Sequence, residues 1–362
     1  MTQGRRWTIL GALAGLAVLV SLLGGYPAAG QGGSVQEKLD RLSRLTGAER
    51  QRYLEEEAFK EGKIVMYSSD HPELVRAWNA EFKKKYPQID SQFIRMNTRD
   101  ALQRAVNESR AGRPVTDLLH PPASELAVLQ QADLVARYVS PEAADFGPDF
   151  RDADGMWTVH WFAPAVVGFN TNLIQRAEVP TRIEDLADPK FKGKLGRVSA
   201  GGRWVAGILK AKGEAAGMDI VRRLAQQEPR IYESSNAVGN ALASGQIAIA
   251  FDLHVTVAGP LKTQGAPVDY VIAEPMLILP VYQIVMKDAP HPFAAALAYD
   301  WMLAKQGQAL YKPLDQIGPR KDTEYPFADV MRGAKTVVSL SVGLLADPAR
   351  YNKIFEDLYI RK

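Results

Sequence analysis

Cysteine is absent from this sequence of 362 residues. Disulfide bonds and thiolate metal sites are therefore impossible, and so is the lipid anchor of a lipoprotein, which is attached to a cysteine. A strong charge imbalance is also lacking, because the net charge is only +3. Arg5 and Arg6 lie in the first 30 residues, and the remainder holds 42 basic and 41 acidic side chains. The charge balance gives no electrostatic case for binding nucleic acid.

Several motifs of nucleotide-binding and hydrolytic enzymes are missing as well. The sequence contains neither the Walker A pattern nor the G-x-G-x-x-G fingerprint, and it has no G-x-S-x-G elbow. It also has no low-complexity tract and no visible internal repeat. An exported hydrolase that uses His and Asp side chains is an alternative that these absences disfavour.

The N-terminus has the pattern of a secretory signal. Arg5 and Arg6 precede an apolar run over residues 9–23, and small or turn-forming residues follow. We expect cleavage near Gln31 and export to the periplasm. A membrane anchor is the alternative, but the run is short of the roughly 20 residues that span a bilayer. The arginine pair leaves both the general secretory route and the twin-arginine route open.

A buried strand and a polar turn follow Gly62, where the sequence reads Gly-Lys-Ile-Val-Met-Tyr-Ser-Ser-Asp-His. A short apolar run after a glycine predicts a buried parallel strand, and the apolar spacing over residues 72–86 predicts a helix. In open α/β sheets, ligands bind beyond the carboxyl ends of the strands. The turn residues that we expect to face a ligand are Ser68, Ser69, Asp70 and His71.

Strands and helices alternate along most of the chain. Further strands are predicted at residues 89–96, 115–119, 195–198, 231–232, 247–251 and 268–272, and helices at 99–111, 203–212, 215–226, 237–243, 255–263 and 292–304. This alternation predicts an α/β fold with a parallel sheet that helices cover on both faces.

Two long apolar segments can carry the chain between domains. They are residues 157–170, where Pro164 predicts a bend between two strand segments, and residues 276–286. The predicted organisation is a signal peptide (1–30), an N-terminal helical brace (31–61), a first lobe (62–163 and 276–362) and a second lobe (164–275). We expect a ligand cleft between the lobes that closes by a hinge motion.

Seven segments in colinear order carry a resemblance to a known family. They are EGKIVMYSSDH (61–71), TDLLHPP (116–122), DLVARYVSP (133–141), VVGFNTNL (166–173), DLADPKFKGK (185–194), ASGQIAIAF (243–251) and KDAPHPFAAALAYDWMLAKQGQ (287–308). Together they resemble solute-binding proteins of bacterial ABC importers, family 1, in the branch that includes periplasmic ferric-ion-binding proteins. The resemblance implies the type II periplasmic-binding fold, delivery to an inner-membrane permease, no catalysis and no cofactor.

The ferric ligands of that branch are only partly present in this sequence. Tyr67 and His71 match the pattern around the family's histidine ligand. The family's carboxylate would follow the third strand, where this chain has His120-Pro121-Pro122. The paired tyrosines would follow residues 247–251, and this region contains none. The resemblance therefore implies a pocket that is aimed at a solute other than the bare ferric ion.

Two turns with open backbone N–H groups are candidate anion sites. Ser199, Ala200, Gly201 and Gly202 precede a helix, and Arg203 adds a charge with bidentate geometry for phosphate or carboxylate. Ser234, Ser235 and Asn236 form the second turn. Ordinary N-capping of helices is the alternative for both turns.

Four polar side chains at predicted strand ends are candidate metal ligands: His71, His120, Asp252 and His254. Histidine and aspartate suit Zn, Ni and Fe, although the same residues could simply hydrogen-bond turns. Tyr282 is a candidate aromatic contact in the cleft.

The sequence thus predicts a monomeric periplasmic receptor for a small solute with a phosphate, phosphonate or carboxylate group, which acts with an ABC importer permease. Binding of ferric iron or a metal chelate is the alternative function, and a sensor without transport would share the same fold.

Overall fold

A computed structural model describes residues 33–361, which belong to one compact unit. The predicted signal peptide over residues 1–30 and its cleavage site near Gln31 lie outside the described residues. Within residues 33–361, no helix has both the length and the apolar character needed to cross a bilayer.

The described elements alternate as the sequence predicts. The strands are β1 (Lys63–Ser68), β2 (Asp90–Arg95), β3 (Leu118–His120), β4 (Val135–Ala136), β5 (Thr158–Asn170), β6 (Leu195–Val198), β7 (Arg230–Tyr232), β8 (Ile249–His254), β9 (Val268–Val271), β10 (Met276–Met286) and β11 (Val337–Ser339). The helices are α1 (Val35–Ser43), α2 (Gly47–Glu61), α3 (Pro72–Lys85), α4 (Thr98–Arg110), α5 (Ala123–Gln131), α6 (Gly201–Lys212), α7 (Glu214–Ala225), α8 (Ser235–Ala243), α9 (Val255–Thr263), α10 (Pro292–Leu303), α11 (Lys305–Gln308), α12 (Ala328–Gly333) and α13 (Pro348–Phe355). Short turns, mostly 3₁₀, connect several of them.

Local sequence signals explain many of these boundaries. Ser34 and Glu37 form a reciprocal capping box at the start of α1. Gly62 ends α2 in the left-handed conformation, with φ of 66°, which glycine adopts without a Cβ clash. This turn leads directly into β1. β8 continues three residues beyond the predicted end at 251, because His254 pairs with Ala165 of β5.

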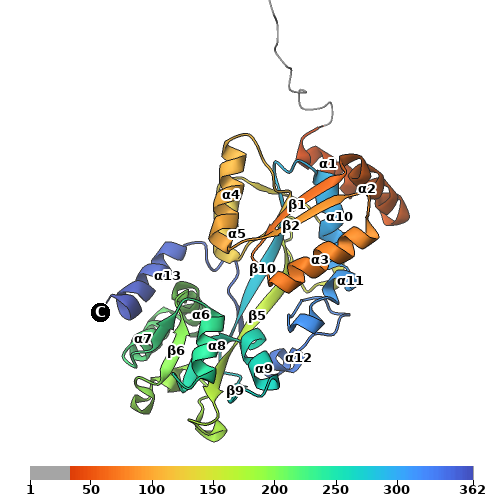
Figure 1. Ribbon diagram of the computed structural model, residues 1–362. Coiled ribbons are helices and arrows are strands. Elements are labelled where there is room, and N and C mark those ends of the chain that lie inside the picture. Colours follow the sequence, from red (N-terminus) through yellow and green to blue (C-terminus); the bar gives the residue numbers. More distant parts are fainter. Residues whose placement is uncertain (1–32, 362) are drawn as a thin grey trace, which may run out of the picture. The chain divides into compact units, whose positions relative to one another are not determined.

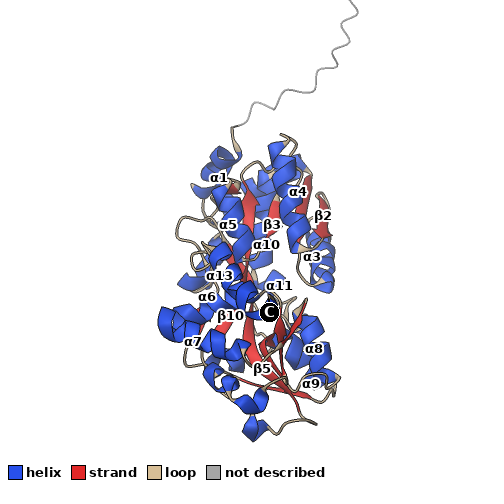
Figure 2. Cartoon of the chain, turned by 90° about the vertical axis from the view of Figure 1, so that its left-hand side faces the viewer, coloured by secondary structure: helices blue, strands red, loops and turns tan. Residues whose placement is uncertain are grey.

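One path of strands runs through the sheet in the order β2-β1-β3-β10-β5-β8-β6-β7. β1 lies parallel to both β2 and β3, and β6 lies parallel to both β7 and β8, as the alternation predicts. Figure 2 shows helices on both sides of the strands. The α/β class and the helix-covered parallel strands are therefore confirmed.

β5 and β10 join the two ends of this path and lie side by side in the middle of the sheet (Figure 1). Their antiparallel pairing runs from Thr158 opposite Gln283 to Pro164 opposite Ile278. From Ala165 onward, β5 pairs with β8 and β9 instead. β5 is thus one strand rather than two segments, but its change of partner falls at Pro164, which cannot donate a backbone hydrogen bond.

The N-terminal helices pack against α10, which is buried along its whole length. Arg50 of α2 reaches through this interface, where its Nη1 lies 2.9 Å from Asp300 Oδ2. Its Nη2 donates to Tyr138 Oη at 2.6 Å, and Tyr138 in turn donates to Asp300 at 2.7 Å. The three side chains thus form a buried group held by one ion pair and two hydrogen bonds.

Replacing Arg50 with Ala should lower the free energy of unfolding by about 3–5 kcal/mol, because it leaves the Asp300 carboxylate buried and without its cation. Urea denaturation followed by circular dichroism measures the change. Arg52→Ala is the matched control, since Arg52 is exposed on the same helix. Equal loss in both variants would contradict the role of the buried pair.

Candidate functional site

The four turn residues after β1 divide between the core and the surface. Ser68 and Asp70 are buried, and the Ser68 hydroxyl donates to Asp70 Oδ2 at 2.5 Å. His71 is exposed and caps α3, because its Nδ1 accepts from the Glu73 N–H at 3.3 Å. Ser69 is partly exposed between them. Of these four residues, His71 lines a cavity that is described below, and Asp70 belongs to a buried cluster.

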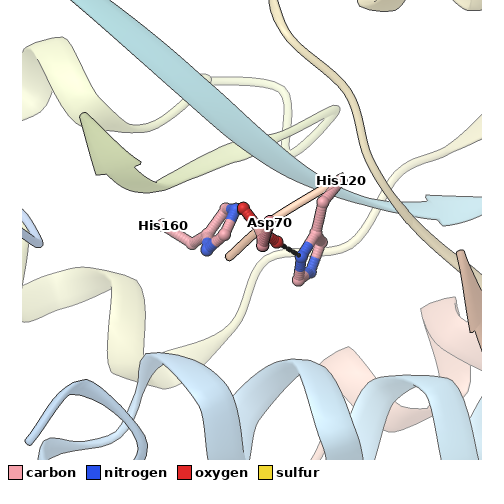
Figure 3. A group of neighbouring side chains, drawn as sticks. All are labelled: Asp70, His120 and His160. Atoms are coloured by element: carbon pink, nitrogen blue, oxygen red, sulfur yellow. Dashed lines mark hydrogen bonds and ion pairs between the residues drawn. The ribbon is translucent and has the colours of Figure 1, made fainter. Parts of the chain in front are cut away.

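Asp70, His120 and His160 form a fully buried group (Figure 3). The two imidazole rings lie against each other, with centroids 4.1 Å apart, and the carboxylate faces a nitrogen of each ring. Asp70 Oδ2 is 2.6 Å from His120 Nδ1 and 3.7 Å from His160 Nε2. Burial acts to raise the pKa of Asp70, but His160, His120 and the Ser68 hydroxyl outweigh it and hold that pKa below its usual range. Burial and the nearby His120 lower the pKa of His160 well below its usual range.

The predicted metal set of His71, His120, Asp252 and His254 is not brought together. Across residues 33–361, the cluster of three or more such side chains that could hold an ion is the Asp70 group, which shares only His120 with the predicted set. Asp252 instead faces Arg197, whose Nη2 lies 3.2 Å from Asp252 Oδ2. His120 ends β3 near the predicted strand end, whereas Asp252 and His254 lie inside β8, which runs on to His254.

Arg197 is a buried cation that sequence analysis did not single out. Its guanidinium lies 4.6–5.5 Å from the ring centroids of Trp204, Phe251, Phe355 and Tyr359. Burial raises the pKa of Asp252, and the positive charges of Arg197 and Arg203 act against that rise. The ion pair and the aromatic rings tie the C-terminal helix α13 to β6, β8 and α6.

A first cavity of about 390 Å³ lies where the starts of α4, α5 and α6 approach one another; we call it the α6 cavity. The residues that line it are Thr98, Arg99, Pro122, Ser124, Glu125, Ala200, Gly202, Arg203, Leu345, Pro348, Tyr351 and Asn352. Three members of the predicted anion turn are thus at this cavity. Arg99, Glu125 and the C-terminal residues were not predicted.

The glycines of the predicted anion turn make room for α13. Ser199 and Ala200 are exposed, whereas Gly201 and Gly202 are buried. A Cβ on Gly201 would overlap the Phe355 ring, and one on Gly202 would overlap Asn352. The expectation that both glycines leave open backbone is corrected in this respect, because α13 packs directly onto them.

A second cavity of about 540 Å³, which we call the α9 cavity, contains two other predicted residues, His71 and Asn236. Its full lining is His71, Asn236, Asn240, Thr256, Val257, Pro260, Leu261, Gln264, Leu314, Asp315 and Gln316. Most of the polar groups in this lining are uncharged amides.

The second predicted turn begins α8, and one of its three residues, Asn236, lines the α9 cavity. Ser234 caps α8 by accepting from the Ala237 N–H at 3.2 Å. Ser235 Oγ accepts from the His254 N–H at 3.3 Å. Burial, followed by the charge of Arg203, lowers the pKa of His254 to about 3. The capping interpretation is therefore correct for Ser234, while Asn236 reaches the α9 cavity.

Tyr282 is fully buried in β10, and its hydroxyl accepts from the Val342 N–H at 3.1 Å. It lines neither cavity. His160 and Asn240 were not predicted from the sequence. No local signal marks a histidine inside a buried strand, and only the pairing of β5 brings His160 beside Asp70.

His254 should make stability depend on pH. Its pKa is lower in the folded chain (about 3) than the ordinary 6.5 of an unfolded histidine, so between these values the unfolded chain binds more protons. The free energy of unfolding should therefore fall as the pH is lowered from 7.5 to 5.0. His254 contributes at most about 2 kcal/mol to this fall, and less because its side chain is partly exposed to solvent. Urea denaturation at both pH values should show a smaller loss for His254→Gln. Equal losses would refute this contribution.

Gly202→Ala should destabilise the packing of α13 on α6 by about 1–3 kcal/mol, because the added methyl group overlaps Asn352. Thermal unfolding measures the change. A second change, Asn352→Ala, removes part of the overlap and should recover part of the loss in the double variant. Wild-type stability in Gly202→Ala would contradict the close approach of the two helices.

Comparison with known proteins identifies the family to which this chain belongs. A model of the bacterial extracellular solute-binding protein family matches residues 124–317, more than half of the chain. The Fe(3+)-binding periplasmic protein of Serratia marcescens is 23% identical over 191 residues, which is 51% of this chain and 54% of that protein. The chain thus matches about half the length of this curated relative.

Solved structures share the fold at low sequence identity. Iron-bound HitA from Pseudomonas aeruginosa matches with a TM-score of 0.70 and 19% identity, over 82% of this chain and 99% of HitA. AfuA from Actinobacillus pleuropneumoniae, solved with fructose-6-phosphate, matches with a TM-score of 0.70 and 18% identity, over 82% and 98% of the two chains. These similarities confirm the type II periplasmic-binding fold, and the family model shows that this chain belongs to the bacterial extracellular solute-binding proteins.

Proposed function

We propose that this protein is the periplasmic receptor of an ABC importer, and that it binds a small solute through an anionic phosphate, phosphonate or carboxylate group. It would hold the solute between two lobes and deliver it to an inner-membrane permease. The observation that carries the proposal is the lining of the α6 cavity, where three helix N-termini and two arginines meet.

Helix N-termini favour anions for two reasons that act together. The first backbone N–H groups of a helix have no partner within it, and the helix dipole places partial positive charge at that end. Thr98 opens α4, which Asn97 caps, and Ser124 lies in the first turn of α5. Ala200 is the N-cap of α6, whose first two glycines are covered by α13, so α6 contributes mainly through its dipole. Thr98, Ser124 and Ala200 all line the same cavity.

The two arginines of this cavity are available to a ligand. Among the described residues, neither Arg99 nor Arg203 has an ion-pair partner within 4 Å. Glu125 is the one acidic side chain in the lining, and its carboxylate accepts from the Ser124 hydroxyl at 2.6 Å. Guanidinium groups pair with phosphate or carboxylate by two parallel hydrogen bonds, which favours an oxyanion at this position.

The lining of the α9 cavity suits the uncharged remainder of such a solute. Asn236, Asn240 and Gln264 offer amide donors and acceptors, and Thr256 offers a hydroxyl. A molecule with several hydroxyl groups and one anionic group, such as a sugar phosphate, would use both kinds of lining. AfuA, which shares the fold, was solved with fructose-6-phosphate.

Closure around the solute would follow from the strand arrangement. Each cavity takes its walls from both sides of the β5–β10 pair: α4 and α5 follow strands on one side, and α6, α8 and α9 lie on the other. The predicted lobes, residues 62–163 with 276–362 and residues 164–275, would move about this pair. Hinge closure around a ligand is an established motion of periplasmic binding proteins.

A metal chelate is the second candidate ligand. HitA was solved with iron, and the Trichodesmium protein of the same fold was solved with iron and citrate, at a TM-score of 0.69 and 17% identity over 82% of this chain and 99% of that one. The carboxylates of a chelator would occupy the α6 cavity in the same way as a phosphate. Tyr351 supplies a phenol in that lining.

Isothermal titration calorimetry against fructose-6-phosphate, inorganic phosphate and ferric citrate tests the proposal. Arg203→Ala should weaken binding of the anionic ligand by about 10- to 100-fold, since a charge-assisted hydrogen bond contributes about 1.5–3 kcal/mol. Lys210→Ala is the matched control, because Lys210 is exposed farther along the same helix. Unchanged affinity in Arg203→Ala would refute the anion site, and tight binding of ferric ion without any anion would refute the proposed ligand class.

A further inference from the structure

The buried group of Asp70, His120 and His160 lies outside the solute-binding machinery. None of the three residues lines the α6 cavity or the α9 cavity. Asp70 follows β1, His120 ends β3, and His160 lies near the start of β5 (Figure 3). The side chains of the two histidines have no exposed surface, and that of Asp70 has 1%. Three separate segments thus bring metal-binding atoms to one enclosed point.

In each imidazole ring, the nitrogen that does not face Asp70 has a hydrogen-bond partner. His120 Nε2 lies 3.1 Å from Gln283 Oε1, and Gln283 is oriented because its Nε2 donates to the Tyr299 carbonyl at 3.0 Å. His160 Nδ1 lies 2.8 Å from the Tyr311 hydroxyl. Metal-binding histidines characteristically have their second nitrogen fixed in this way, so that the first nitrogen points at the ion.

The carboxylate is held as firmly as the rings. The Trp161 indole N–H donates to Asp70 Oδ1 at 2.5 Å, and the Ser68 hydroxyl donates to Oδ2. These contacts orient Oδ2 between His120 Nδ1 and His160 Nε2. The three potential ligand atoms lie within 4.8 Å of one another.

One of these atoms lacks a hydrogen-bond partner. His160 Nε2 is buried and unpartnered among the described residues, although it points toward Asp70 Oδ2 at 3.7 Å. A buried polar atom without a partner is rare in native proteins and requires an explanation. The short contact between them accounts for Asp70 and His120, and Tyr311 holds His160 Nδ1, but neither interaction gives His160 Nε2 a partner.

We propose that Asp70, His120 and His160 bind one divalent transition-metal ion. Two imidazoles and a carboxylate are ligands that Zn²⁺, Co²⁺ and Fe²⁺ accept. Two atoms bound to one tetrahedral ion at about 2.0–2.1 Å lie about 3.3 Å apart, and the present separations of 2.6 and 3.7 Å fall on either side of that value. Small side-chain shifts would therefore place all three atoms at bonding distance.

Binding of the ion needs a free lone pair on His120 Nδ1, so any proton on that nitrogen must leave to solvent as the metal–nitrogen bond forms. The other ring nitrogen, Nε2, can keep its contact with Gln283 Oε1 at 3.1 Å. No electron transfer or other reactant is involved.

The enclosed position makes this ion a resident of the protein rather than its cargo. The ion would join the end of β1, the end of β3 and the start of β5, next to the β5–β10 pair. Because a metal that binds only the folded state stabilises it, loading should raise the unfolding temperature. Loading should require unfolding or opening of the site, since the ligand side chains are buried.

Refolding the protein with Co²⁺, and separately with Zn²⁺, tests the proposal. After gel filtration, native mass spectrometry should show one ion per chain, the Co²⁺ form should have visible d–d absorption, and both forms should unfold at a higher temperature than protein refolded with EDTA. His160→Asn removes Nε2 and can retain a bond to Tyr311, so it should bind Co²⁺ at least 10-fold more weakly. His71→Gln, which alters an exposed histidine outside the cluster, should bind as wild type does.

The outcomes separate clearly. Wild-type protein that retains neither ion after refolding would overturn the proposal, as would a His160→Asn variant with wild-type affinity. Should that variant fail to fold, the metal content and absorption of the wild type decide the question alone. Solute binding by Arg203→Ala is measured independently, so failure of the metal site leaves the proposed receptor function standing.

Discussion

Antiparallel hydrogen bonding between β5 and β10 is the constraint on which the rest of the structure depends. In the strand order, this pair connects β2, β1 and β3 on one side to β8, β6 and β7 on the other. Both strands are long and almost wholly buried, so the pair is stabilised along its length by packing as well as by backbone bonds. The helix starts that line the two cavities are positioned relative to one another by these two strands.

Hydrophobic patterning was sufficient to predict most of this architecture. The run at Ile64–Tyr67 gave a buried strand, and the long apolar segments at 157–170 and 276–286 gave the two central strands. Glycine and capping residues located the turns, as at Gly62 and Ser234. Local signals succeed here because strand burial and helix capping are decided within a few residues of the chain.

The candidate site was predictable only in part, since it depends on contacts between distant segments. The turn before α6 was identified from its small residues, yet those residues proved to accommodate α13, which lies some 150 positions later. Asp252 was expected to face a ligand and instead pairs with Arg197, a residue that reads as an ordinary strand position. His160 carries no local signal either. Side-chain partners across a sheet are set by tertiary packing, which spacing along one chain does not encode.

The packing of α13 against α6 has a consequence for the order in which the molecule is completed. The α6 cavity draws its walls from residues as far apart as Thr98 and Asn352. During synthesis, the strands and helices of residues 63–303 can all emerge and pair before Asn352 exists. The wall that residues 345–352 form is therefore added after the sheet, and until then the opening that faces a solute has a different shape.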